Sequence, residues 1–600
     1  MDKIVVLDFG GQYAHLIANR IRRLDVFSEI KEGNASASEL MEYKGIIMSG
    51  GPASVSAEGS VKCDPAVFEL GIPILGICYG HQLVGHFLGG TVQKGQVSEY
   101  GQAKVKFLKR EGVFEGVNEE ESVWMSHFDQ VVKAPAGFEI VASTDDCPIA
   151  AMMNKEKRIY TLQFHPEVTH TPCGMGILEN FVRLTGALRE WNIENYIEQI
   201  LAEIKEKVAA RKVFLMISGG VDSTVAFSLL AKALGQDRIY GLFVDTGFMR
   251  MNERKEVEEA LKEIGVNNLH VYDGADRYFA ALVGIYEPEE KRRIIGDLFI
   301  DIQQEVSEKL GLNPDEWMLG QGTIYPDWIE TGGSRHADKI KTHHNRVERI
   351  QKLEAEGKVI EPLVQLYKDE VRLVGEKLGL PHKLVWRHPF PGPGLAVRCL
   401  CVSKEDLPQN AETLNSRLNE LVLSDGYTAT VLPIKSVGVQ GDERTYRHPV
   451  LLCGEGRDWG RLNTLATRLT NQCHDINRVL LCLNTDKIAS LSIRKNYITH
   501  ERILTIQMAD KLVMDFIAEV QIDKEIWQFP TVLIPLILND ENGESIVLRP
   551  VESKEAMTAN FYPMRQEHLA ELVKRLSSLS GISGIFYDIT NKPPGTIEWE

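Results

Sequence analysis

Long apolar runs are missing from this sequence, as are cysteines at metal-binding spacing and a surplus of positive charge. No apolar stretch approaches the ~20 residues that span a bilayer, and no signal core is recognisable, so we expect a cytosolic protein without a membrane partner. Nine cysteines without a C-x-x-C pair favour reduced thiols over a disulfide framework or a zinc site. The net charge of -17 argues against nucleic acid as a partner.

Six hundred residues exceed what one hydrophobic core usually holds, so the sequence predicts several domains. Short apolar strands alternate with amphipathic segments, which indicates an α/β fold with a doubly wound parallel sheet in its middle part. The last third carries two weakly similar β-β-α-β patterns and reads as α+β. We predict domains at 1–190, 191–390 and 391–600, with a charged lid near 334–358 that contains His343 and His344.

Cys78 stands on a predicted strand-to-helix turn between Gly76 and Gly80, directly after an apolar run. Flanking glycines permit the strained turn of a nucleophile elbow, and the following helix N-terminus favours a thiolate. His165 follows a second predicted strand, and Glu167 lies two residues further on. The pattern predicts a Cys-His-Glu triad, against the alternative of a buried structural cysteine and an unrelated histidine.

Around this elbow, several groups are predicted to hold the substrate of a cysteine nucleophile. Gly50 and Gly51 follow a predicted strand and offer backbone amides to an oxyanion, together with the amide of Tyr79. An ordinary tight turn explains the two glycines equally well in isolation. Gln82, Ser126 and His127 are further predicted contacts of the amide substrate, with plain surface positions as the alternative.

A second glycine-rich turn connects a buried-type strand with a helix. Backbone amides and hydroxyl groups converge there, so it predicts a phosphate site, whereas an ordinary βα turn is the alternative. No G-x-x-x-x-G-K-[ST] motif is present; the turn resembles the pyrophosphate loop of ATP pyrophosphatases. Asp222 is the predicted Mg²⁺ ligand. The predicted ATP residues are Ser218, Gly219, Gly220, Val221, Asp222, Ser223 and Thr224, with Val244 and Asp245 at the next strand end.

Together with the stretch 387–394 and the tail 592–600, these motifs resemble the glutamine-hydrolysing GMP synthetase family over the whole chain. The resemblance implies a class I glutamine amidotransferase domain, an ATP pyrophosphatase domain and a C-terminal domain that binds xanthylate (XMP). It further implies a ligase of guanine nucleotide biosynthesis that uses Mg²⁺ and makes GMP from XMP, ATP and glutamine through an adenylyl-XMP intermediate. The XMP contacts it implies are Pro391, Gly392, Arg444, Gln528, Lys592, Thr596, Ile597 and Glu598.

Three features depart from the family pattern: Phe128 where many members have glycine, a charged helix after His344, and a longer C-terminal domain. The extra length leaves a monomer or a homodimer open. Two other functions also stay open at this stage. One is a different glutamine-fed, pyrophosphate-forming synthetase acting on a deamidated cofactor or an amino acid, and the other is a regulatory binding protein built from inactive modules.

Overall fold

The computed structural model describes residues 1–11, 13–57, 59–313, 315–328, 356–440, 443–539, 541–553 and 559–600. His343, His344 and most of the predicted lid at 334–358 lie outside these residues. The chain divides into two compact units. Unit 1 comprises Met1–Glu203, Thr323–Leu353 and Pro362–Val374, and unit 2 comprises Ile204–Gly322, Glu354–Glu361 and Gly375–Glu600.

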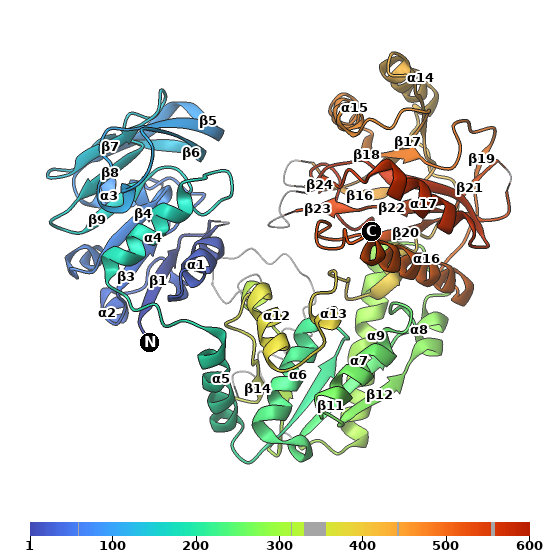
Figure 1. The fold of residues 1–600 in the computed structure, drawn as a ribbon, viewed down its shortest axis with the longest axis horizontal. Helices are drawn as coiled ribbons and strands as arrows, with labels where there is room; N and C mark the ends of the chain where they lie inside the picture. Colours follow the sequence, from blue (N-terminus) through green and yellow to red (C-terminus); the bar gives the residue numbers. More distant parts are fainter. Residues whose placement is uncertain are drawn as a thin grey trace. The chain divides into compact units, whose positions relative to one another are not determined.

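Unit 1 is built on a nine-stranded sheet with the order β2-β1-β3-β4-β9-β8-β7-β5-β6 (Figure 1). The five strands from β2 to β9 run parallel, and β8 pairs antiparallel with β9. The strands are β1 Lys3–Asp8, β2 Phe27–Glu32, β3 Gly45–Met48, β4 Ile74–Ile77, β5 Thr91–Phe107, β6 Glu120–Lys133, β7 Glu139–Ser143, β8 Ala151–Asn154 and β9 Ile159–Leu162. The helices are α1 Ala14–Arg22, α2 Ala37–Leu40, α3 Tyr79–Phe87, α4 Gly174–Thr185 and α10 Tyr325–Trp328, with short turns η1 Pro65–Glu69 and η2 Gly112–Phe114.

Both faces of the parallel part of this sheet are covered by helices. Ile4 and Val6 of β1 belong to the core that α1 and α4 complete, whereas Val5 and Leu7 belong to a second core with residues of α2 and α3. Successive side chains of a strand point to opposite faces, so a strand buried on both sides is continuously apolar. This explains the short apolar runs of the first domain and confirms the α/β prediction.

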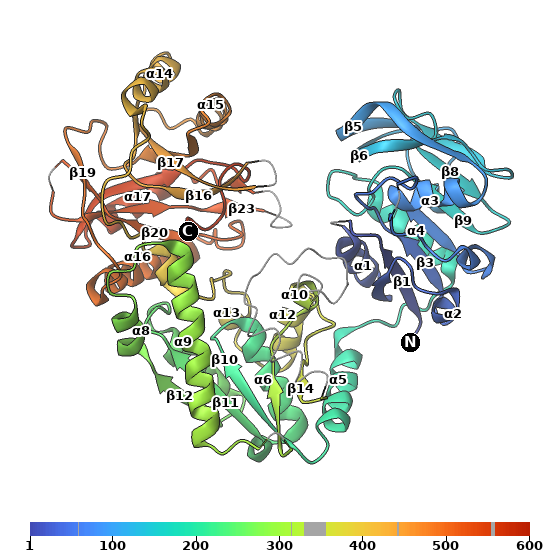
Figure 2. The ribbon, with the colours of Figure 1, turned by 180° about the vertical axis from the view of Figure 1, so that it is seen from behind.

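Unit 2 begins with a five-stranded parallel sheet of order β12-β11-β10-β13-β14. Figure 2 shows α6 and α9 beside it. Its strands are β10 Lys212–Ile217, β11 Ile239–Asp245, β12 Leu269–Asp273, β13 Trp317–Gly320 and β14 Val359–Ile360. The accompanying elements are α6 Val221–Leu234, η3 Gln236–Arg238, α7 Glu253–Glu263, α8 Ala275–Ala281, α9 Pro288–Lys309, α13 His382–Val385 and η5 Gly394–Arg398. Helices α5 Ile193–Val208 and α12 Lys368–Lys377 each contain a boundary between the units.

The last third of the chain contributes a mixed sheet of order β15-β17-β18-β25-β22-β20, with β16 added on β17. Its strands are β15 Thr428–Val431, β16 Ser436–Gln440, β17 Glu443–Cys453, β18 Ile476–Cys482, β20 Thr531–Ile534, β22 Glu544–Leu548 and β25 Ile582–Asp588. The helices are α14 Ala411–Leu423, α15 Trp459–Gln472, α16 His500–Glu519 and α17 Gln566–Ser577. Two strand pairs complete it, β19 Leu491–Ile493 with β21 Leu536–Leu538, and β23 Val551–Glu552 with β24 Asn560–Phe561.

The predicted duplication is visible in this sheet. β15, β17, α15 and β18 form one β-β-α-β unit, and β20, β22, α17 and β25 form the other. In each unit the first pair of strands is antiparallel and the second is parallel, and the two units meet through antiparallel β18 and β25. The two patterns therefore form halves of one sheet rather than separate subdomains, because their last strands pair edge to edge.

Among the residues that the structure describes, no helix is both long enough and apolar enough to cross a membrane.

Candidate functional site

The predicted nucleophile elbow is present in unit 1. Cys78 lies between β4 and α3 with a φ of 52°, a left-handed conformation that is strained for a residue with a side chain. Neighbouring glycines make the turn possible: a Cβ on Gly80 would lie 2.4 Å from the carbonyl oxygen of Met48, and one on Gly76 would lie 2.8 Å from the carbonyl of Gly80. The backbone strain is concentrated on the predicted nucleophile, as expected for a functional position.

His165 and Glu167 lie beside this cysteine as a buried pair. His165 Nδ1 and Glu167 Oε1 are 2.6 Å apart, and the His165 and Glu167 side chains are almost fully buried. Burial alone lowers the pKa of His165, but Glu167 and then Cys78 outweigh it and raise that pKa to about 10. His165 therefore carries a second proton at neutral pH. A cysteine with a histidine beside it is the usual arrangement of a thiol nucleophile.

The predicted oxyanion groups also border the elbow. A Cβ on Gly50 would lie 3.1 Å from His165 Cε1 and 3.7 Å from Cys78 Cβ, so the Gly50 backbone faces both of these side chains. Gly51 is equally confined, because its Cβ would lie 2.9 Å from the Phe9 carbonyl oxygen and 3.3 Å from the ring of Tyr79. Only glycine fits these positions without displacement of a neighbour.

Gln82, Ser126 and His127 lie near the same elbow with partners of their own. Gln82 Nε2 donates to the Asp129 carbonyl at 2.8 Å, and the Ser126 carbonyl accepts from Cys78 Sγ at 3.6 Å. The His127 imidazole is engaged with Glu99, at 3.0 Å from its Oε2. Glutamine contacts by these three residues stay predictions.

We expect Glu167→Gln to destabilise the imidazolium form of His165, because the substitution removes the carboxylate charge that stabilises it. The pKa of His165 should fall, and iodoacetamide should alkylate Cys78 more slowly at neutral pH because less positive charge then stands beside the sulfur. Glutamine-dependent turnover should fall by on the order of 10- to 100-fold, since the variant retains the nucleophile but loses most of the general acid. Exposed Glu179 on α4 offers the control Glu179→Gln. An unchanged alkylation profile would contradict the assignment.

The second glycine-rich turn connects β10 with α6 in unit 2. Gly219 has a φ of 77°, and Gly220 precedes the first residue of α6. Ser218 Oγ accepts from the Gly220 amide at 3.3 Å and lies 3.2 Å from Ser223 Oγ. Thr224 Oγ1 donates to the Gly220 carbonyl at 2.9 Å. The loop is thus held by its own hydroxyl groups at a helix N-terminus, where backbone amides attract an anion.

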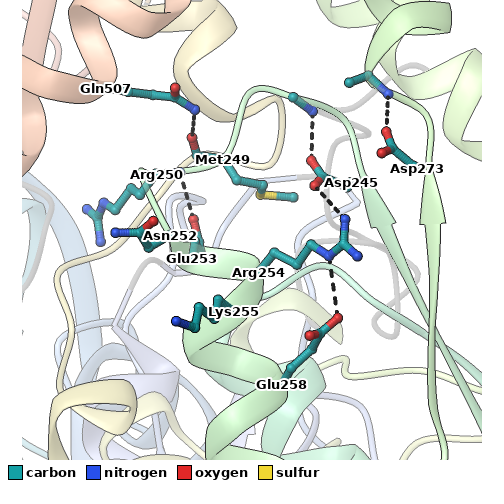
Figure 3. Close-up of a pocket in the computed structure, with 12 residues that line it drawn as sticks. Asp245, Met249, Arg250, Asn252, Glu253, Arg254, Lys255, Glu258, Asp273 and Gln507 are labelled. Atoms are coloured by element: carbon teal, nitrogen blue, oxygen red, sulfur yellow. Dashed lines mark hydrogen bonds and ion pairs between the residues drawn. The ribbon is translucent and has the colours of Figure 1, made fainter.

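Val244 and Asp245 are the last two residues of β11, at its carboxyl end. Asp245 Oδ1 accepts from the Gly247 amide at 3.0 Å, and its Oδ2 lies 3.6 Å from Arg254 Nη1. A cavity of about 390 Å³ opens at this sheet edge (Figure 3). In open α/β sheets, ligands bind at the carboxyl ends of the strands. The lining residues are Asp245, Gly247, Met249, Arg250, Asn252, Glu253, Arg254, Lys255, Glu258, Asp273, Ala275 and Gln507.

Glu253 lines this cavity and also lies next to the glycine-rich loop. A Cβ on Gly219 would lie 3.3 Å from Glu253 Oε1, and the same oxygen accepts from Arg387 at 2.7 Å. Buried charges continue beyond the cavity: Asp510 lies 3.4 Å from Arg250 and 3.7 Å from Arg398. Buried ion pairs of this kind are costly to break from one side, so they fix the relative positions of their elements.

Three of the predicted XMP contacts meet at the C-terminal tail. Arg398 donates to both carboxylate oxygens of Glu598 at 2.8 and 3.0 Å, and Gln528 Nε2 donates to Glu598 Oε1 at 2.9 Å. Gln528 also donates to the Pro389 carbonyl at 3.3 Å, which ties the segment containing Pro391 and Gly392 to the tail. Thr596 Oγ1 accepts from Arg478 at 2.7 Å.

Lys592 lies in a cluster of positive charge at the same tail. Burial and the adjacent Arg549 lower the pKa of Lys592. Arg478 and Arg549 are fully buried, and Asp588 pairs with both at 2.8 and 3.1 Å. One carboxylate thus faces two guanidinium groups and Lys592 is close by. The remaining positive charge is complementary to a phosphate.

Sequence reasoning missed Arg398, Arg478 and Arg549, although a signal was present. Asn477 and Arg478 interrupt the otherwise apolar strand β18, and a buried arginine is rare unless it is paired or binds a ligand. Arg444, in contrast, is exposed on β17, with Nη1 3.3 Å from Glu289 Oε1. No contact described within unit 2 joins Arg444 to Lys592 or Glu598, and its role stays a prediction.

Comparison with known proteins covers both units. The family model described as glutamine amidotransferase class-I matches residues 5–184, the NAD synthase model matches 193–291, and the GMP synthase C terminal domain model matches 515–599. The solved structure of a putative GMP synthase subunit from Thermoplasma acidophilum is 33% identical over 32% of this chain and 96% of that chain, with a TM-score of 0.28.

Curated relatives extend this likeness over the full length. A probable glutamine-hydrolysing GMP synthase from Leptospira interrogans is 45% identical over 605 aligned positions, covering 100% of this chain and 99% of the relative. The glutamine-hydrolysing GMP synthase of Lactobacillus johnsonii is 45% identical over 80% of this chain and 96% of its own length. With its nucleophile elbow, pyrophosphate-type loop and C-terminal tail, the chain belongs to the glutamine-hydrolysing GMP synthase family, the ligases that form GMP from XMP, ATP and glutamine.

Proposed function

We propose that this chain makes GMP with Cys78, His165 and Glu167 as its ammonia-releasing triad. As a glutamine-hydrolysing GMP synthase it converts XMP, ATP and glutamine into GMP, AMP, pyrophosphate and glutamate. The geometry supports the triad because the strained φ of Cys78 and the 2.6 Å pair of His165 and Glu167 occur at one buried place. A cysteine, a base and a residue that orients the base are the elements of nucleophilic amide hydrolysis.

In this reaction the Cys78 thiolate attacks the amide carbon of glutamine. The C–N bond of the tetrahedral intermediate breaks as His165 gives its proton to the leaving nitrogen, which departs as ammonia and leaves a thioester. His165 then takes a proton from water, whose oxygen attacks the thioester and releases glutamate and the thiolate. The backbone of Gly50, Gly51 and Tyr79 is the proposed donor set for the developing oxyanion, and Gln82, Ser126 and His127 are the proposed contacts of the amino-acid end.

The loop 218–224 is the proposed site of the ATP phosphates, with Val244 and Asp245 at the neighbouring strand end. Its backbone amides and the α6 N-terminus favour an anion, and the loop hydroxyls hold the turn in shape. Asp222 lies in the first turn of α6, directly after these groups, and offers a carboxylate, the kind of ligand that Mg²⁺ prefers. Mg²⁺ when bound supplies neutralisation of phosphate charge, and Asp222 is the residue that would hold it.

XMP is proposed to bind at the tail, where Lys592, Arg478 and Arg549 supply positive charge for its phosphate. Glu598 and Gln528 are the proposed partners of the purine ring, and Arg398 holds the Glu598 carboxylate in place through two hydrogen bonds. Further proposed contacts are Pro391, Gly392, Arg444, Thr596 and Ile597. The C2 oxygen of XMP attacks the α-phosphate of ATP, pyrophosphate leaves, and ammonia then displaces AMP from C2.

The observation that carries this proposal is the tail itself, where a carboxylate held by Arg398 and a cluster of positive charge lie a few residues apart. The decisive measurement is pyrophosphate release from ATP with XMP, with a deamidated dinucleotide, or with aspartate as the acceptor. Release that requires XMP supports the proposal. Release with either other acceptor would indicate a different glutamine-fed synthetase, and no release with any of them would indicate a binding protein.

We expect Asp222→Asn to reduce XMP-dependent pyrophosphate release by at least about 100-fold with either nitrogen donor, because it removes charge stabilisation from phosphoryl transfer. Raising Mg²⁺ should recover part of the rate. Asp237, exposed in the short turn after α6, offers the control Asp237→Asn. An unchanged rate in a folded Asp222→Asn protein would show that this carboxylate serves neither the metal nor the phosphates.

Other features are proposed on the sequence alone. These are the domain boundaries at 190 and 390, a lid with His343 and His344, a cytosolic location, the absence of nucleic acid and membrane partners, and a monomeric or homodimeric state. Size-exclusion chromatography with light scattering distinguishes a monomer from a homodimer.

A further inference from the structure

Three side chains with metal-ligating atoms meet inside unit 1, next to the glutamine elbow. Glu99 on β5 and His127 on β6 are directly paired residues of neighbouring strands, and Cys147 lies in the turn between β7 and β8. One ligand atom from each of the three lies within 4.8 Å of the other two. All three side chains are largely buried, so they do not form a solvated surface cluster.

The hydrogen bonds of His127 orient it as a metal ligand. His127 Nδ1 lies 3.2 Å from the Asp129 carbonyl oxygen, which can only accept, so Nδ1 carries the proton. His127 Nε2 lies 3.0 Å from Glu99 Oε2, another acceptor. Each ring nitrogen of His127 thus faces an acceptor oxygen, and a metal cation in place of the Nε2 proton would satisfy the imidazole and the Glu99 carboxylate together. Metal-bound histidines typically donate their other nitrogen to a carbonyl in this way.

Glu99 and Cys147 are oriented by a single second residue. Thr144 Oγ1 donates to Glu99 Oε1 at 3.0 Å, which leaves Oε2 for another partner. The same hydroxyl oxygen accepts from the Cys147 amide at 2.9 Å and so fixes the turn that carries the thiol. A supported set of one thiolate, one imidazole and one carboxylate matches the donors that zinc prefers.

The spacing is also compatible with a zinc ion. Zinc lies about 2.0–2.1 Å from nitrogen and oxygen ligands and about 2.3 Å from sulfur, so tetrahedral ligands are roughly 3.3–3.6 Å apart. The 3.0 Å between His127 Nε2 and Glu99 Oε2 needs only a small expansion. We propose that Glu99, His127 and Cys147 form a zinc site, with water as the fourth ligand.

Zinc binding at this site releases protons from the ligands to solvent. The Cys147 thiol loses its proton to solvent as the Zn–S bond forms, and a proton on His127 Nε2 is displaced in the same way. The metal-free alternative is a simple imidazolium–carboxylate pair of His127 with Glu99.

The location gives the site a specific consequence. Ser126, one residue before the ligand His127, accepts a hydrogen bond from Cys78 Sγ, and Gln82 donates to the carbonyl that His127 Nδ1 contacts. Zinc would therefore fix the segment 126–129 against the nucleophile. We expect it to stabilise unit 1 without altering ammonia-dependent synthesis.

The test uses the full-length chain with Cys78→Ala, which removes the other thiol that has a histidine beside it. Chelator-treated protein is titrated with Zn²⁺ against a chromophoric chelator, and with Co²⁺ while thiolate-to-cobalt absorption is recorded. We expect one equivalent of Zn²⁺, a cobalt–thiolate band and a higher melting temperature with metal, since a ligand of the native state stabilises it. Adding Cys147→Ser or Glu99→Gln should weaken Zn²⁺ binding by at least about 100-fold.

Cys173→Ser is the matched control, because Cys173 is another free thiol of unit 1 that is not part of the cluster. The Cys173→Ser protein should still bind one equivalent of Zn²⁺ and still show the cobalt–thiolate band. Binding that survives both ligand variants, or that falls equally in Cys173→Ser, would overturn the zinc site, and so would no bound zinc at all. If Cys147→Ser does not fold, the isosteric Glu99→Gln decides alone. The result is independent of XMP or ATP turnover, so it stands or falls separately from the proposed function.

Discussion

Replacing Cys78 with alanine will abolish GMP formation from glutamine and leave GMP formation from ammonium salt essentially unchanged. The proposed nucleophile would contribute only to ammonia release, whereas the proposed ATP loop and the tail belong to unit 2. Loss of an enzyme nucleophile reduces turnover by about 10⁴-fold or more. The substitution should not disturb the fold, because alanine keeps the Cβ of Cys78 and the glycines at 76 and 80 still permit the turn. Initial rates at saturating ATP and XMP with each nitrogen donor measure the effect.

The informative quantity in this experiment is the ratio of the glutamine-dependent rate to the ammonium-dependent rate. Cys173→Ala provides a control, since it removes a half-buried thiol of the same unit and should preserve both activities. Equal loss of the glutamine and ammonia rates in a folded Cys78→Ala protein would mean that Cys78 is not a dedicated nucleophile. Retention of both rates would transfer the role to another residue.

The elbow could be predicted from the sequence because its constraints are local. Gly76, Cys78 and Gly80 encode the strained turn themselves, and the apolar run before them indicates the strand. The same holds for the loop after β10, whose glycines and hydroxyls are contiguous. The partner His165 was predictable only from its position at a second strand end, and the sheet order β4-β9 is what brings it close.

The charges around the tail could not be located in this way. Arg398, Arg478 and Arg549 come from three separate segments and meet Glu598, Thr596 and Asp588 only through the fold. The sequence shows a charged residue, Arg478, in a strand whose following residues are apolar, but it does not show the partner of that charge. The duplicated pattern was recognisable, whereas the pairing of β18 with β25 that joins its halves depends on long-range contacts.

Deleting residues 592–600 will abolish synthesis with both nitrogen donors, and the structure shows that much of this loss is a loss of folding. Trp599 is fully buried and donates from Nε1 to Asp588 at 3.0 Å. Glu600 forms a buried ion pair with Lys291, which has no exposure of its own. Removing a core tryptophan costs about 3–5 kcal/mol, and breaking a buried pair costs a similar amount. Against a typical stability of about 5–15 kcal/mol, the truncated chain should unfold at markedly lower denaturant concentration.

Lys592→Gln separates ligand binding from that structural role, because Lys592 is only half-buried and its backbone bonds to Ala559 survive the change. Removing one charge-assisted contact with phosphate costs about 1.5–3 kcal/mol, so KM for XMP should rise about 10- to 100-fold while KM for ATP moves much less. The melting temperature should stay close to that of the unchanged chain, as it should for the control Lys574→Gln on the exposed face of α17. A variant that melts normally and retains its XMP dependence would show that the tail lysine is not a phosphate ligand, and the buried charge of Arg478 and Arg549 would then serve the fold of the tail alone.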